Sequence, residues 1–214
     1  MHTQRNTYQL LSLFVALLAC VCQAFSQDAE NTFFRHLLSQ ESPHLIISTD
    51  FESLFEKENE ELDATLAVKG DDRVWDIKIE ARGKYRRRVC PFPPLRLNFK
   101  KGDHKEAGYK PYDKIKLVTH CSEEDISLET IYEEYLAYQI YNCITDESFQ
   151  ADLVQMTYQD TEGEFDPIES WGIILEPNDE LADRLGGKLY DKYNLPEDSL
   201  VAENYLHTAL FQFM

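Results

Sequence analysis

The feature that most constrains this chain is a basic segment between two stretches of alternating hydrophobicity. Residues 74–82 read VWDIKIEAR, so Ile77, Ile79 and Ala81 alternate with charged residues. Residues 95–100 read LRLNFK and alternate in the same way. Because strict alternation is typical of a strand that buries one face, the sequence predicts two strands that flank the basic segment.

The segment between these two strands is rich in cations. Gly83 is followed by Lys84, Arg86, Arg87 and Arg88, although the whole chain has a formal net charge of -18. Guanidinium groups match phosphate and other oxyanions in geometry, and a glycine lets the backbone approach a ligand closely. Arg82–Arg88 is therefore a candidate binding site for phosphate or another anion. The alternative is a solvated loop whose arginines pair with nearby carboxylates.

The size and charge of the chain limit the possible classes of function. Its 214 residues, 43% of them hydrophobic, are enough for one domain with a sizeable core, or for one domain and part of a second. The strong negative charge disfavours nonspecific binding to nucleic acid, because phosphates would be repelled by most of the surface. The chain has no G-x-S-x-G or H-E-x-x-H motif that would support a hydrolase, and no CxxC pair that would support a structural zinc site.

The N-terminus has the features of a signal peptide over residues 1–26. Arg5 precedes an apolar run over 10–22, and small residues stand at the -3 and -1 positions before Gln27. A lipoprotein signal is the alternative, in which Cys20 becomes a lipidated N-terminus. In both cases we expect a secreted or cell-envelope protein. No later stretch is apolar and long enough for a transmembrane span.

Three cysteines follow the predicted cleavage site. Cys90, Cys121 and Cys143 allow at most one intramolecular disulfide and leave one thiol. The spacing of these residues leaves their pairing open.

Other elements follow from periodicity and turn signals. Further strands are expected at 45–47, 62–69, 114–118, 154–158 and 171–176, and helices at 50–55, 127–144, 179–185 and 200–214. Residues 27–44 are interpreted as a leader into the domain.

The strongest helix prediction is 127–144. Its expected apolar stripe contains Leu128, Ile131, Tyr132, Tyr135, Leu136 and Cys143, with Glu133 and Glu134 at the edges. Such edge carboxylates are usually solvated or paired on the surface. The last helix ends in the apolar residues LFQFM with no capping signal, so we interpret the sequence as a fragment cut inside its domain.

The order of these motifs resembles the spore coat protein H (CotH) kinase-like family, in its divergent secreted form from Bacteroidetes-type bacteria. The resemblance covers roughly residues 62–214. It consists of the Arg82-Gly83 strand-loop, the LRLNF strand, the IKLV strand, the EEYLAY helix and the WGIILE strand, in that order.

The resemblance implies an α+β, atypical protein-kinase-like fold. An antiparallel β-rich N-lobe with one long helix would occupy 45–176, and 177–214 would begin an incomplete helical C-lobe. ATP and Mg²⁺ would be the cofactors, and an unidentified protein the substrate.

The same resemblance assigns individual residues. Arg82, Gly83 and Arg86 would lie near the nucleotide phosphates. Lys116 would be the phosphate-side lysine, and Glu134, or else Glu133, the carboxylate that orients it. Glu176 would lie near the hinge and the adenine.

In this family the catalytic and metal-binding aspartates follow the helix that corresponds to 200–214, and the sequence stops there. We therefore expect no catalytic or metal-binding residue in this chain. The predicted function is the N-terminal part of a secreted CotH-like ATP-dependent phosphotransferase, inactive as given. The alternative is a non-catalytic secreted or surface module for structure or adhesion, which binds an anionic partner through Arg82–Arg88.

Overall fold

The computed structural model describes residues 31–57, 60–122, 125–190, 196 and 199–213. Thr32–Met214 forms one compact unit. The predicted signal peptide (1–26), its cleavage site and the candidate lipidation site Cys20 lie outside the described residues.

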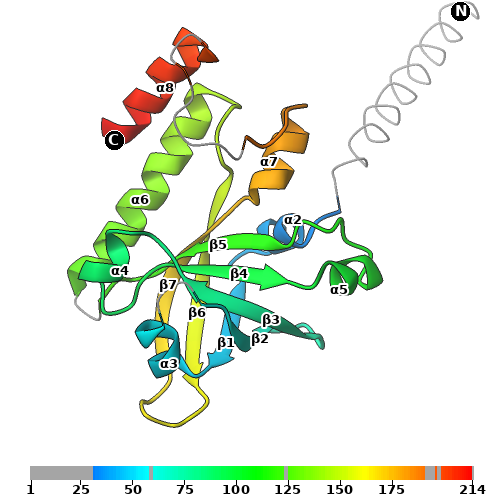
Figure 1. Cartoon of the computed structure of the whole chain (residues 1–214), viewed down its shortest axis with the longest axis vertical. Helices are drawn as coiled ribbons and strands as arrows, with labels where there is room; N and C mark the ends of the chain where they lie inside the picture. The colour runs from blue at the N-terminus through cyan, green and yellow to red at the C-terminus, as the bar shows by residue number, and fades with distance from the viewer. Residues whose placement is uncertain (1–30, 58–59, 123–124, 191–195, 197–198, 214) are drawn as a thin grey trace, which may run out of the picture. The chain divides into compact units, whose positions relative to one another are not determined.

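The described residues form seven strands that close into a barrel (Figure 1). The strands follow one another around the barrel in the order β1-β2-β3-β4-β5-β7-β6, and every neighbouring pair is antiparallel except β6 and β1, which run parallel. Their bounds are β1 (His44–Thr49), β2 (Leu62–Val68), β3 (Val74–Ala81), β4 (Leu95–Phe99), β5 (Lys114–Val118), β6 (Ala151–Asp160) and β7 (Ile168–Leu175).

Alternation along the strands fills the barrel interior. In β3, Ile77 and Ile79 are buried while the residues between them face outward, as the sequence predicted. Leu95 and Leu97 of β4 are buried in the same way. Each such side chain contributes about 1.5–3 kcal/mol when it is fully removed from water. The alternating pattern therefore determines which face of each strand enters the core.

The helices are α2 (Phe33–Leu38), α3 (Phe51–Glu56), α4 (Arg86–Val89), α5 (Lys101–Glu106), α6 (Asp125–Ile144), α7 (Asn178–Arg184) and α8 (Ala202–Phe213).

Helix α2 lies within the segment interpreted as a leader. The side chain of Thr32 caps it by accepting a hydrogen bond from the Arg35 amide at 3.0 Å. Its residues Phe33, Phe34 and Leu37 are buried in the main core cluster, so this part of the leader contributes to the core of the compact unit.

The prediction of a kinase-like fold with two lobes is wrong, because the sheet closes into a barrel. The closing contact is the parallel pairing of β1 with β6, in which His44 lies opposite Gln155 and Thr49 opposite Asp160. Alternation predicts which face of each strand is buried, but it does not predict which strand pairs with it. Here the partner of β1 is β6, which is distant from β1 in the sequence. Among the described residues, only α7 and α8 follow the barrel.

Helix α6 covers part of the outside of the barrel. Leu117 and Ile174 belong to the interior cluster, whereas their sequence neighbours form a second cluster on the opposite face of the sheet. This outer cluster consists of Val118, Ile131, Ala151, Ile173 and Leu175, with Tyr135, Tyr138, Leu153 and Trp171 packed against it.

The predicted apolar stripe of α6 is only partly correct. Ile131 is buried, but Tyr132 is 40% exposed, Leu136 is 55% exposed and Cys143 is also exposed. Apolar residues occur on both sides of this helix, and only the side with Ile131 and Tyr135 faces the sheet. No helix in the described part of the chain is long and apolar enough to cross a membrane.

Candidate functional site

Strand pairing places three charged side chains in one row on the outside of the barrel. Glu80 of β3 lies opposite Arg96 of β4, and Arg96 lies opposite Lys116 of β5. Residues in register point to the same face of a sheet. The row continues through Leu175, which packs beneath α6. The charged row therefore borders α6 on the barrel surface.

The turn after β3 brings two arginines to the same place. Gly83 has φ +86°, a left-handed conformation that residues with a side chain rarely adopt. This turn leads into α4, which lies beside α6 in Figure 1. Arg86 Nη2 donates to Glu134 Oε2 of α6 at 2.6 Å. Burial lowers the pKa of Arg82, and repulsion from Arg96 and Arg86 adds to this shift, whereas Tyr138 and Glu134 oppose it.

Lys116 is the most perturbed cation of this group. Burial, and then repulsion from Arg82, lowers its pKa to about 8. Its Nζ donates to Asn178 Oδ1 at 2.6 Å and lies 4.4 Å from the ring centroid of Phe149. Asn178 and Phe149 neutralise none of its charge.

We refer to Arg82, Arg86, Arg96 and Lys116 as the cationic cluster. Arg96 forms an ion pair with Glu80, and Arg86 with Glu134. In the described part of the chain, no carboxylate forms an ion pair with Arg82 or Lys116. Tyr138 of α6 also borders the cluster, where burial and then Glu134 raise its pKa. The cluster thus has more positive than negative charge, within a strongly acidic protein.

The structure brings some of the predicted site residues together, but with other partners than the sequence analysis expected. The structure gathers Arg82, Arg86, Lys116 and Glu134 around the turn at Gly83. Glu134 pairs with Arg86, however, and Lys116 is oriented by Asn178 instead. Glu133, the alternative to Glu134, is exposed to solvent.

Glu176 belongs to a different site. Its side chain is fully buried and accepts hydrogen bonds from Arg184 Nε and Nη2, both at 2.8 Å. Arg35 Nη2 approaches it at 3.3 Å, and the Gln150 amide donates to it at 3.2 Å. The carboxylate is therefore occupied by protein partners rather than open to a ligand.

Sequence reasoning missed one member of the cationic cluster, Arg96, and two residues that contact Lys116. Arg96 was read only as an outward-facing strand residue, yet its register opposite Lys116 makes it part of the site. No sequence pattern connected Asn178 or Phe149 with Lys116, because each reaches this lysine from a segment distant in sequence.

Cys90 and Cys121 form a disulfide, and Cys143 is a free, exposed thiol. The structure therefore has the one disulfide that three cysteines allow, and it gives the pairing that the spacing left open. The disulfide lies next to the cationic cluster in sequence, because Cys90 directly follows α4.

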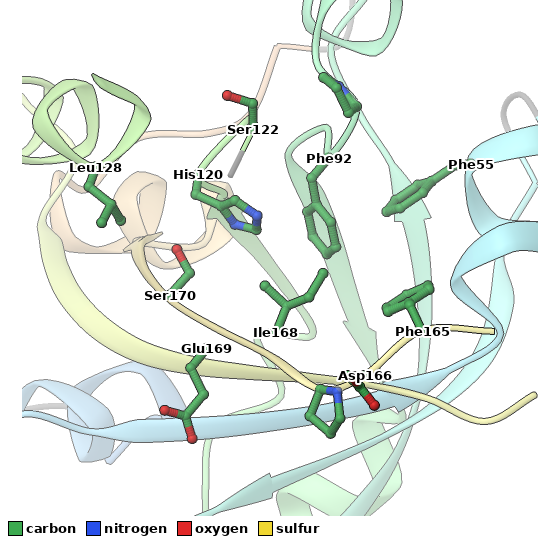
Figure 2. A pocket seen from close by; sticks show the side chains of 12 residues that line it. Phe55, Phe92, His120, Ser122, Leu128, Phe165, Asp166, Ile168, Glu169 and Ser170 are labelled. Carbon is green, nitrogen blue, oxygen red and sulfur yellow. The ribbon is translucent and has the colours of Figure 1, made fainter. Parts of the chain in front are cut away.

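The protein also has an apolar pocket of about 980 Å³ (Figure 2). Its lining includes Phe55, Phe92 and Phe165, and the ring centroids of Phe92 and His120 are 4.7 Å apart. Figure 2 shows Ile168 and Ser170 directed toward these rings. No residue of the cationic cluster lines it among those described. The sequence analysis did not predict this pocket.

ATP and Mg²⁺ are the two cofactors that the resemblance implies, and the cationic cluster suits the phosphates of ATP better than it suits Mg²⁺. Arginine and lysine suit phosphate oxygens, whereas Mg²⁺ requires oxygen ligands such as carboxylates. Glu80 and Glu134, the acids that contact the cluster, are each engaged by an arginine. Within the described residues, no group of three His, Cys, Asp or Glu side chains could hold a metal ion. The residues present fit a phosphate group and do not fit a magnesium ion.

Comparison with protein-family models and with curated proteins gave no match for this chain. The resemblance to the CotH kinase-like family therefore remains a prediction from motif order.

Proposed function

We propose that this protein binds a phosphate-bearing ligand at the cationic cluster. The observation that carries the proposal is the position of Lys116 beside Arg82, with no carboxylate paired to either among the described residues. Like charges held together destabilise each other, and burial adds to that cost. A bound oxyanion would remove this cost, because it supplies the missing negative charge.

The resemblance suggests a nucleoside triphosphate as the ligand, and the cluster supports the binding of its phosphates. We do not extend the proposal to phosphoryl transfer. That reaction depends on bound Mg²⁺ and on a residue that orients the attacking hydroxyl. The acids at the cluster are engaged by arginines.

A second candidate is a secreted or surface module that binds a larger anionic partner. It is favoured by the exposure of the arginine segment, Arg82–Arg88, in which Lys84 and Arg88 face solvent and Tyr85 is 76% exposed. A flat partner could contact these side chains as well as the cluster. A small phosphate would contact only the cluster.

The test is titration calorimetry with inorganic tripolyphosphate and with a non-hydrolysable ATP analogue, each with and without Mg²⁺. Lys116→Met and Arg82→Met should each weaken binding by roughly 10–100-fold, as expected for the loss of one charge-assisted contact. Lys100→Met is the matched control. It also removes a lysine, which directly follows β4 and is exposed and paired with Asp76 at 3.5 Å.

The outcomes separate the candidates. Binding of tripolyphosphate that depends on Lys116 supports the proposal, and tighter binding of the ATP analogue supports a nucleotide ligand. Equal affinity in Lys116→Met and Lys100→Met would show that the cluster is not the site. Binding of an anionic polymer that is lost in Lys84→Gln/Arg88→Gln, without binding of tripolyphosphate, would favour the surface module.

A further inference from the structure

The segment that carries Arg86 is not held by hydrophobic packing. None of the residues of α4 is buried, and Tyr85 and Val89 at its ends are 76% and 51% exposed. A helix of this length is not stable alone. Its cations also repel one another, as do those of the turn before it. Some other interaction must therefore fix the position of this segment.

A covalent cross-link lies directly at the end of α4. Cys90 is buried, forms the disulfide with Cys121, and its amide donates to the Arg86 carbonyl at 2.8 Å. Cys121 closely follows β5, the strand that carries Lys116. The disulfide therefore joins the end of the arginine segment to the end of the lysine strand.

Backbone contacts reinforce this junction. The Phe92 amide donates to the Cys121 carbonyl at 2.9 Å, and the Thr119 hydroxyl donates to the Phe92 carbonyl at 2.9 Å. Cys121 has φ 60°, in the left-handed region that residues other than glycine seldom adopt. Because cysteine seldom adopts this conformation, we infer that the disulfide and the backbone hydrogen bond of Cys121 hold it in place.

The ion pair between Arg86 and Glu134 is a weaker restraint on α4 than the disulfide. The ion pair of Arg86 with Glu134 has side chains that are 41% and 22% exposed, and pairs with this access to water stabilise little. It also involves Arg86 itself, so it cannot hold the segment once Arg86 turns toward a ligand.

We infer that the Cys90–Cys121 disulfide is the positioning device of the proposed anion site: it holds Arg86 beside Arg82 before the ligand arrives. A pre-ordered cation binds more tightly, because the cost of ordering it is not taken from the binding energy. This inference rests on the proposed function and adds to it a role for two residues that touch no ligand.

The test compares tripolyphosphate affinity, at pH 7 and low salt, in the oxidised protein, in Cys90→Ser/Cys121→Ser and in Cys143→Ser. The double variant should bind about tenfold more weakly, which corresponds to about 1.4 kcal/mol. Cys143→Ser should bind like the parent protein, because it removes the free thiol and leaves the disulfide intact.

A second comparison separates positioning from a general loss of structure. In the oxidised protein both Arg86→Gln and Lys116→Met should weaken binding. Without the disulfide, Arg86→Gln should have little further effect, whereas Lys116→Met should retain its full effect. An equal effect of Arg86→Gln in both backgrounds would overturn the inference.

Reversible opening of the disulfide provides the same test if the double variant does not fold. In Cys143→Ser protein, dithiothreitol reduces the bridge to two thiols and is itself oxidised to its cyclic disulfide. After desalting, affinity should be about tenfold lower, and glutathione disulfide, which is reduced as the bridge re-forms, should restore it. Unchanged affinity in the reduced protein would reject the positioning role while leaving the proposed function intact. Failure of the oxidised parent protein to bind tripolyphosphate would reject both.

Discussion

Two regions of this protein contain similar charged residues, but the positive and negative charges balance in only one of them. Around Glu176, Arg35 and Arg184 meet two fully buried carboxylates, Glu176 and Glu180, so positive and negative groups match in number. In the cationic cluster, Arg82 and Lys116 have no carboxylate paired with them among the described residues. The first region balances its own charges, whereas the second keeps an excess of positive charge.

The difference is instructive because both regions join segments that are distant in sequence. The Glu176 network connects α2, the end of β7 and α7, which is a structural task. The cationic cluster connects the turn after β3 with β4, β5 and α6, but leaves positive charge at a cost to stability. An uncompensated charge at a junction is a better indicator of a binding site than the presence of charge itself.

Glu176→Gln should have the largest effect. Removing this buried charge leaves Arg184 and Arg35 without their shared partner, and breaking a buried pair typically costs about 3–5 kcal/mol. Urea unfolding at pH 7 measures the loss. Glu134→Gln is the matched control at the cluster and should cost less than about 1 kcal/mol, because its pair with Arg86 is partly exposed. Similar losses in the two variants would remove the distinction between the regions.

The pH dependence of anion binding should show an effect of about tenfold. The pKa of Lys116 is lowered to about 8, so the side chain loses its proton, and the site one positive charge, as pH rises through that value. Affinity for sulfate, whose own charge is constant in this range, should therefore fall between pH 7 and pH 9. In Lys116→Met the profile should be flat. A parent profile that is also flat would show that Lys116 does not contact the anion.

Lys116→Met should stabilise the folded protein by up to about 1 kcal/mol in the absence of ligand. The folded state holds this lysine with a pKa of about 8, below the ordinary 10.5, so the unfolded state binds more protons between these values. The penalty on the parent protein is complete below pH 8 and disappears as pH rises toward 10.5. The difference in unfolding free energy between parent and variant should therefore be largest at pH 7 and clearly smaller at pH 10. A destabilised variant at pH 7 would contradict this.

Glu180→Gln should have the smallest effect, and in the direction opposite to Glu176→Gln. Burial raises the pKa of Glu180 to about 6, and its Oε2 has no hydrogen-bond partner among the described residues. The folded state thus binds more protons than the unfolded state between pH 4.5 and pH 6, and the charged form is penalised above pH 6. At pH 7.5 the variant should be more stable by less than about 1 kcal/mol, with the gain absent at pH 4.5. Denaturant titrations at both values measure it, and a loss at pH 7.5 would show that the carboxylate charge is needed.

Sequence patterns predicted what is local in this molecule. Alternation predicted β3 and β4 and the faces that they bury, and the cation-rich turn at Gly83 predicted a basic site between them. The pairing of Lys116 with Arg96 was not predicted, because register depends on how the intervening α5 segment folds back.

Long-range features were beyond the reach of the sequence. The network around Glu176 includes Arg35, a residue from the segment interpreted as a leader. The kinase-like fold was expected from the order of motifs, but motif order does not specify that β1 pairs with β6. Local periodicity contains no information about either contact.

The parallel pairing of β1 with β6 also has a consequence for how the chain folds. During synthesis β2 to β5 can pair in succession with neighbours already made, but β1 cannot acquire its second partner until Ala151–Asp160 has emerged. Until then an edge of the growing sheet stays open, and such edges are prone to associate with other chains. The last strand to emerge is β7, which pairs with both β5 and β6. The slow step of folding should therefore be docking of the β6–β7 hairpin onto β1 and β5, and the nascent protein should be most vulnerable to aggregation just before it.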